Sequence, residues 1–274
     1  MLLKDALERG GTENAQFEAE QLLQSAGVDK ITLISEPNRE VFENISAEIR
    51  AKTKRRLSGE PLQYILGEWE FYGLPFKVGD GVLIPRQDTE TLVDVSLKFL
   101  NERERGERKT LDLCAGSGCI GITLAKHADA EVTCVEKSEW AFGYLRENIA
   151  LNGVSVNAVS GDVLKDDTVC GEYDLIVSNP PYLTDGDMMS LQKEVRFEPR
   201  DALYGGADGL DFYKCILGAY PKKLKGGGMI AVEIGMGQEN SVCGIFRENG
   251  IEPRLEKDMC GVYRVVYGIK QTQL

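Results

Sequence analysis

A short segment in the second half of the chain combines an amide side chain with two prolines and an aromatic ring. It reads Ser178-Asn179-Pro180-Pro181-Tyr182 and follows an apolar run typical of a strand. Proline has a fixed φ and no backbone N–H, so this turn presents carbonyl oxygens in set directions. We expect the Asn179 side-chain oxygen and the Pro180 carbonyl to accept hydrogen bonds from one –NH2 group, beside the flat wall of Tyr182. The segment predicts a site for a planar amino or amide nitrogen; the alternative is a plain proline turn.

A glycine-rich turn provides a second candidate site. Residues 112–118 read Asp-Leu-Cys-Ala-Gly-Ser-Gly, after a predicted strand and before an apolar helix. Glycines let the backbone approach a ligand closely, and a helix N-terminus favours negative charge. The string Gly116-x-Gly118-x-x-Gly121 also matches a dinucleotide fingerprint. That match is weak alone, because glycine-rich turns after a strand occur in many α/β folds.

An acidic residue ends the strand that follows the glycine loop. Glu136 lies about 20 positions beyond the loop, where an acidic side chain accepts hydrogen bonds from ribose hydroxyls in nucleotide-binding folds. The alternative is a solvated carboxylate at a strand end, and the glycine loop upstream favours the ribose role.

These residues need a sheet to position them, and seven candidate strands follow Lys109. They are 110–114, 131–136, 155–159, 173–178, 228–234, 252–257 and 262–267. Helical stretches lie between most of them, and such alternation predicts a parallel, doubly wound sheet. The turn near 258–261 is too short for a parallel connection, so one strand near the C-terminus is antiparallel. We predict an α/β fold with a seven-stranded, mostly parallel sheet.

The first 60 residues show a different pattern. Three apolar stripes with helical spacing end at glycines near positions 10, 27 and 59, which predicts three helices. The basic stretch 52–56 lies on the last of them. We interpret it as a solvated face, with a partner contact as the alternative.

A connector joins the two patterns. Residues 68–72 and 74–78 predict a β-hairpin, and Asp88 or Thr89 is expected to cap a helix through about Leu100. The predicted domains are an all-α domain at 1–75 with the hairpin connector reaching about residue 84, and a Rossmann-like domain at 85–274.

Composition excludes several classes of function. The chain has 274 residues, with 44 acidic against 32 basic ones and a net charge of −12, which disfavours binding to phosphate backbones. One histidine excludes mechanisms that need several. Seven cysteines without a Cys-x-x-Cys pair predict reduced thiols and no metal site. No apolar run can span a membrane and no secretory signal opens the chain, so we expect a cytoplasmic protein. We also expect a monomer.

Motifs along nearly the whole chain form one series. They are Arg56, Gly59–Gly67, Phe71–Leu74, Val82–Glu90, the glycine loop, Asn179–Tyr182, Glu194–Pro199 and Val232–Gly235. The series resembles the protein-(glutamine-N5) methyltransferases that act on peptide chain release factors, the PrmC/HemK family. Two residues depart from the family pattern. Cys114 stands where the loop often has its first glycine, so we expect an unstrained backbone there, and Gln87 stands where proline is common.

The resemblance implies methyl transfer from S-adenosylmethionine, leaving S-adenosylhomocysteine, to the side-chain amide of the glutamine in the release factor's Gly-Gly-Gln loop. The helical segment has no glycine loop and no acceptor cluster for a cofactor, so we expect the helical domain to recognise this substrate. The implied cofactor residues are Cys114, Ala115, Gly116, Ser117, Gly118, Glu136, Asp162, Val163 and Asn179. The implied catalytic and substrate-binding residues are Asn179, Pro180, Pro181 and Tyr182, with Arg86 and Thr89 bracing the mouth of the pocket. Arg86 and Arg196 are equally well explained as structural ion-pair partners.

Three alternatives stay open at this point. A nucleic-acid methyltransferase acting on exocyclic amines shares the Asn-Pro-Pro-aromatic logic, but acidity and the helical domain argue against it. A nicotinamide-dependent oxidoreductase leaves residues 179–182 unexplained. An inactive binding module is disfavoured by the intact motifs.

Overall fold

The chain forms two compact units. The computed structural model describes residues 3–12, 14–35, 43–104, 106, 108–165 and 169–272. One unit is Met1–Glu68 with Gln192–Phe197, and the other is Trp69–Leu191 with Glu198–Leu274. The division therefore falls at the start of the predicted hairpin, after Glu68, and not after the hairpin as expected. The six-residue segment Gln192–Phe197, from the second half of the chain, also belongs to the helical unit, and no sequence pattern predicted this.

The larger unit is built on a seven-stranded sheet with the order β5-β4-β3-β6-β7-β9-β8. Its strands are β3 (Lys109–Leu113), β4 (Glu131–Glu136), β5 (Val156–Ser160), β6 (Tyr173–Ser178), β7 (Leu224–Glu233), β8 (Arg254–Lys257) and β9 (Tyr263–Ile269). All pairs among β3 to β7 are parallel, and β9 lies antiparallel between β7 and β8. The predicted fold class, with a single antiparallel strand near the C-terminus, is confirmed.

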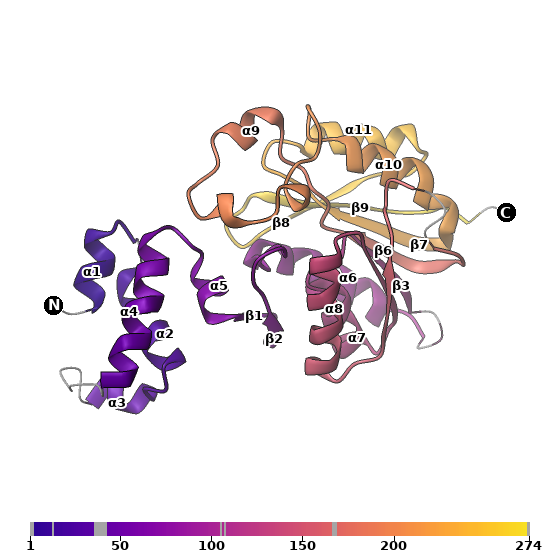
Figure 1. Ribbon diagram of the computed structural model, residues 1–274. Helices are drawn as coiled ribbons and strands as arrows, with labels where there is room; N and C mark the ends of the chain where they lie inside the picture. Colours follow the sequence, from indigo (N-terminus) through magenta and orange to yellow (C-terminus); the bar gives the residue numbers. More distant parts are fainter. Residues whose placement is uncertain are drawn as a thin grey trace. The chain divides into compact units, whose positions relative to one another are not determined.

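Helices cover both faces of this sheet (Figure 1). One face packs against α10 (Asp211–Ala219) and α11 (Glu239–Glu248), and the other against α6 (Glu90–Asn101), α7 (Cys119–Ala128) and α8 (Glu139–Asn152). All six residues of β6 are buried, as expected for a strand covered on both sides. The remaining elements of this unit are β1 (Glu68–Phe71, whose first residue belongs to the helical unit), β2 (Leu74–Lys77), α9 (Asp185–Met189) and the short 3-10 helices at Gln87–Thr89, Arg200–Ala202 and Tyr220–Lys223.

The sheet places the two candidate loops next to each other. The strand order reverses between β3 and β6, and ligands of such sheets bind at the carboxyl ends of the strands at this point. Leu113 pairs with Ser178 in the register, and the Ser178 hydroxyl donates to the Leu113 carbonyl at 2.7 Å. The glycine loop and the Asn179 turn therefore leave the sheet from neighbouring positions.

The helical unit contains α1 (Leu3–Arg9), α2 (Ala15–Ser25), α3 (Lys30–Ser35), α4 (Glu43–Leu57) and α5 (Leu62–Leu66), together with the 3-10 turn Val195–Phe197. Three of these helices follow the predicted stripes, and α3 and α5 are additional. Arg56 is buried, with its guanidinium bonded to Glu18 and to Glu194, so the expectation of a solvated basic face is wrong at this residue. Across the described ranges, no helix is both long and apolar enough to span a membrane.

Candidate active site

The glycine loop takes a left-handed path between β3 and α7. Cys114, Gly116 and Gly118 have φ values of 60°, 57° and 83°. A Cβ at Gly118 would overlap the side chain of Leu145, so glycine is needed there for space as well as for conformation. The expectation of an unstrained backbone at Cys114 is wrong, because L residues with a side chain reach this region only at a cost of roughly 1–2 kcal/mol.

Glu136 is tied to the glycine loop by its own carboxylate. Its Oε2 accepts from the Gly116 N–H and its Oε1 from the Ser138 N–H, each at 2.7 Å. Burial raises the pKa of Glu136 above its usual value, while these two backbone donors act in the opposite direction. The Lys137 backbone N–H also acts on this carboxylate, and since a carboxylate has about four acceptor positions, the group retains capacity for a ligand hydroxyl. The geometry suits a ribose.

Asp162 and Val163 follow β5 beside Glu136. The Asp162 carboxylate lies 3.1 Å from Lys137 Nζ and accepts from the Leu164 N–H. Burial alone would raise the pKa of Asp162, but the Lys137 and Leu164 hydrogen bonds lower it below its usual value. Asp162 therefore provides a fixed negative group just after β5, beside the strand end that carries Glu136.

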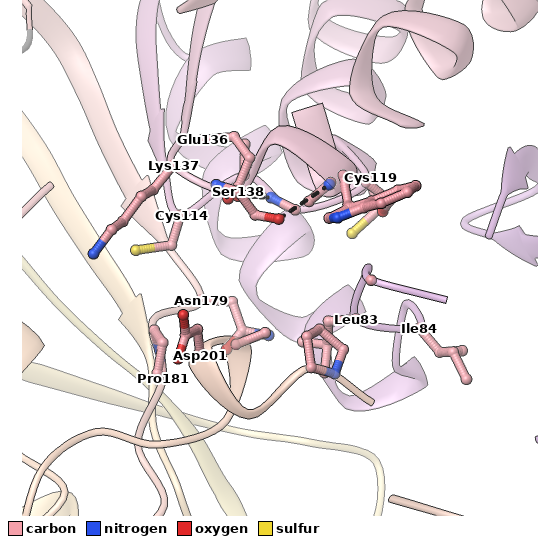
Figure 2. A pocket seen from close by; sticks show the side chains of 18 of the residues that line it. Leu83, Ile84, Cys114, Cys119, Glu136, Lys137, Ser138, Asn179, Pro181 and Asp201 are labelled. Atoms are coloured by element: carbon pink, nitrogen blue, oxygen red, sulfur yellow. Dashed lines mark hydrogen bonds between the residues drawn. The ribbon is translucent and has the colours of Figure 1, made fainter. Parts of the chain in front are cut away.

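These segments line one pocket of about 660 Å³, a size within the usual range for small-molecule sites. Residues 114–117, 136–138, Asp162 and Val163 form part of its wall, and residues 83–86, Thr89, Asn179, Pro181 and 199–202 form another part. Figure 2 shows Cys114, Glu136 and Lys137 on one side of the pocket and Asn179 with Pro181 on the other. The predicted cofactor loop and the predicted amide site thus share a single cavity.

Asn179 is held in place by Thr89. Its Nδ2 donates to the Thr89 Oγ1 at 3.2 Å. Thr89 was expected as a possible helix cap, but its hydroxyl makes no capping bond to α6, since it serves the site instead. With the amide nitrogen directed at Thr89, the amide oxygen lies on the opposite branch of the side chain, where it can accept from a ligand.

The two prolines and Tyr182 differ in their relation to the pocket. Pro181 is a wall residue, whereas Pro180 and Tyr182 are not among the described residues that line the cavity. Pro180 is buried, and the Tyr182 carbonyl accepts from Gln238 Nε2 at 3.0 Å. Burial raises the pKa of Tyr182 to about 12, so its phenol stays neutral. The role of Tyr182 as a substrate wall stays a prediction.

Arg86 is an ion-pair partner of Glu198, a residue that the sequence reasoning did not single out. Glu198 also accepts from the Ile84 N–H at 3.1 Å, and its side chain is 1% exposed. It thereby fastens the segment 84–86 to the pocket wall. Arg196 lies in the segment that belongs to the helical unit. The motif Glu194–Pro199 contained Glu198, but the sequence showed no link to a segment 112 positions away.

Two buried carboxyl groups near the pocket were also not predicted. Asp112 accepts from the Gly121 N–H at 2.9 Å, and burial raises its pKa to about 7. Glu233 ends β7 next to the Asn179 turn, and burial raises its pKa to about 7 as well. Asp112 was included in the glycine-rich turn and Glu233 in the motif Val232–Gly235, but neither residue was assigned a role from the sequence.

Comparison with known proteins places this geometry in a family. Residues 2–67 match the PrmC N-terminal domain, and residues 89–201 match the methyltransferase small domain. The release factor glutamine methyltransferase of Geobacter sulfurreducens is 42% identical over 264 residues, covering 94% of this chain and 90% of the relative. That of Thermodesulfovibrio yellowstonii is 39% identical, covering 87% and 86%. The chain belongs to the release factor glutamine methyltransferase family.

The fold agrees with this membership. A methyltransferase from Pyrococcus furiosus superposes with a TM-score of 0.56 at 22% identity, covering 84% of this chain and 100% of that one. The chain is thus an S-adenosylmethionine-dependent protein-glutamine methyltransferase, and the oxidoreductase alternative is wrong. The pocket residues fit this methyl donor, because the Glu136 carboxylate faces the pocket and the backbone of the loop is open at Gly116, where nothing lies within 4 Å of a Cβ position.

Proposed function

We propose that this methyltransferase modifies the side-chain amide nitrogen of the glutamine in the Gly-Gly-Gln loop of peptide chain release factors. The observation that carries the proposal is Asn179, an amide fixed by Thr89 on the wall of the same pocket that contains Glu136 and the glycine loop. The names of relatives that align over most of this chain support the choice of substrate.

The methyl donor is proposed to lie along the part of the pocket formed by the strand ends β3, β4 and β5. Glu136 accepts from the ribose hydroxyls, residues 114–118 hold the methionine portion, and Asp162 with Val163 flanks the adenine. S-adenosylmethionine supplies a methyl group activated by its sulfonium. Among the cofactor residues predicted from the sequence, Gly118 is the one that acts from outside the pocket wall, by giving α7 its start.

The substrate amide needs positioning more than it needs a base. An amide nitrogen is a poor nucleophile, because its lone pair is delocalised into the carbonyl. The two N–H groups donate to the Asn179 oxygen and to the Pro180 carbonyl, which orients the nitrogen toward the methyl group; such alignment supplies several kcal/mol of the barrier. The amide proton becomes acidic only as the new bond forms, so no strong base is required. The one histidine of the chain, His127, packs against Tyr72 and does not line the pocket.

The helical unit is proposed to recognise the release factor. The predicted cofactor residues, Cys114 to Asn179, all belong to the sheet unit. A separate unit that binds the protein substrate would supply binding energy remote from the reacting amide, which enzymes use to position the reacting group. A cytoplasmic, monomeric state stays a prediction.

The experiment that tests the proposal compares methyl acceptors. The full-length protein is incubated with radiolabelled S-adenosylmethionine and purified release factor, release factor with the loop glutamine changed to alanine, RNA or DNA. We expect label only on the unaltered release factor. Label on RNA or DNA in place of the protein would favour a nucleic-acid amine methyltransferase and refute the proposal.

A further inference from the structure

Glu233 occupies a buried position directly beside the Asn179 turn. Its neighbour Val232 pairs with Ser178 across β6 and β7, so Glu233 and Asn179 are the next residues along two adjacent parallel strands. The Glu233 backbone is fixed, because its carbonyl accepts from the Tyr213 hydroxyl at 2.9 Å. The residue is 2% exposed. Burying a carboxyl group so deeply costs free energy unless the group is hydrogen-bonded or paired with an opposite charge.

The Glu233 carboxyl group is hydrogen-bonded to Thr89, whose hydroxyl also accepts from Asn179. Its other oxygen, Oε2, makes no hydrogen bond to any described residue. A threonine hydroxyl has one proton to donate and lone pairs to accept with. When that proton goes to Glu233, the Thr89 oxygen is left as an acceptor, and Asn179 must present its Nδ2 to it. The direction of one hydrogen bond therefore sets the orientation of the amide.

We propose that Glu233 is a positioning residue for methyl transfer: by accepting the Thr89 proton, it holds Asn179 with its amide oxygen directed at the substrate nitrogen. This inference rests on the proposed function of Asn179. When Glu233 is protonated, it can donate to Thr89, and the Thr89 proton becomes free to bind the Asn179 oxygen. The Asn179 side-chain amide then flips and presents an N–H group to the substrate amide. Because the substrate nitrogen also carries N–H groups, no hydrogen bond forms between them.

The surroundings of Glu233 place its protonation, and with it the flip of the Asn179 amide, within a measurable pH range. Burial raises the pKa of Glu233 to about 7; Asp88 also raises it, while the Thr89 bond, Arg264 and Arg86 lower it. The uncharged titratable groups that face it are Tyr182, Tyr213 and Cys119. All three have raised pKa values and stay neutral near pH 7. The positioning state of Glu233 is thus the ionised one, present above about pH 7.

Two substitutions separate positioning from packing. Glu233→Gln keeps an oxygen that accepts from Thr89 but cannot titrate. We expect the turnover of this variant at pH 8 to stay within a few-fold of wild type. We also expect that its turnover does not decrease when the pH is lowered below 7, whereas the turnover of wild type does. Glu233→Leu removes the acceptor, and we expect kcat to fall about 10- to 100-fold, the scale of a misplaced reacting group, with the S-adenosylmethionine dissociation constant unchanged. Asp112 is the other carboxyl group with a pKa near 7, so Asp112→Asn serves as the control. We expect this variant to retain the decrease in turnover at low pH.

A second measurement does not depend on turnover. The side-chain amide resonances of Asn179, assigned with Asn179→Ala, are followed by NMR between pH 5.5 and 8.5 in the ligand-free protein. We expect them to shift with a midpoint near 7 in wild type and to stay constant in Glu233→Gln. The same titration in both proteins, or wild-type kcat in Glu233→Leu, would overturn the inference. Wild-type protein that leaves release factor unmethylated would refute the proposed function instead, and the amide titration would still decide the role of Glu233.

Discussion

Asn179→Ala removes the amide oxygen proposed to accept from the substrate and leaves the proposed ribose and methionine contacts intact. Losing one oriented hydrogen bond from a transition state costs about 2–4 kcal/mol. Since about 1.36 kcal/mol corresponds to a tenfold change in rate, we expect turnover to fall roughly 30- to 900-fold. The fold loses only the 3.2 Å bond to Thr89, which is worth about 1 kcal/mol. The variant should therefore be folded, bind the methyl donor normally and be nearly inactive.

A matched control comes from a second asparagine–threonine pair. Asn157 Nδ2 donates to Thr133 Oγ1 at 3.4 Å, and Asn157 is not among the described residues that line the site. Asn157→Ala deletes the same kind of bond without touching the reaction. Single-turnover methylation of release factor, calorimetry with S-adenosylmethionine and thermal melting are measured for both variants. Turnover in Asn179→Ala within threefold of Asn157→Ala would refute the assignment of Asn179.

Three further changes follow from the geometry. Glu136→Ala should weaken S-adenosylmethionine binding and also lower the melting temperature, because the Gly116 and Ser138 N–H groups lose their acceptor; an unchanged dissociation constant would remove Glu136 from the site. Cys114→Gly should raise the free energy of unfolding by about 1 kcal/mol in urea, because glycine adopts φ 60° without strain, and no gain would show that the loop absorbs the strain. Arg56→Met should destabilise the helical unit by about 3 kcal/mol, since it leaves the Glu18 side chain, which is only 12% exposed, without its partner. Hydrogen exchange should then accelerate in α2 and α4, and KM for release factor should rise while S-adenosylmethionine affinity stays constant; an unchanged KM in the loosened variant would contradict recognition by this unit.

The sheet was predictable because its signals are local. Strands such as 131–136 and 173–178 are short segments rich in apolar and β-branched residues, and the structure gives them the predicted bounds. The two additional helices, α3 and α5, are six and five residues long, too short to show a helical period. The membership of 192–197 in the helical unit depends on contacts such as that between Arg56 and Glu194, which are 138 positions apart.

The binding loops were predictable for a related reason. The carboxyl ends of parallel strands meet at one edge, so residues that directly follow β3, β4 and β6 had to lie near one another. Cys114, Glu136 and Asn179 all line the pocket; Glu136 was also indicated by its spacing from the glycine loop, and Cys114 by the family resemblance. The backbone strain at Cys114 was not predictable, because residue type indicates which conformations are inexpensive and not which one the tertiary structure imposes.

Thr89 was expected at the mouth of the pocket and lines it, but the links from Asn179 to Thr89 and from Thr89 to Glu233 escaped prediction, because each residue also has a more ordinary local explanation. Thr89 precedes a helix and resembles a capping residue, yet its hydroxyl is bonded to Asn179, 90 positions away. Glu233 resembles a solvated carboxylate at a strand end, yet it is buried and bonded to Thr89. The Thr89 oxygen accepts from Asn179, where a capping threonine would accept from a backbone N–H, and its one proton is donated to Glu233. A threonine that could cap a helix but makes no capping bond therefore indicates a tertiary partner for its hydroxyl, and here that partner is the carboxyl group that we propose controls the catalytic amide.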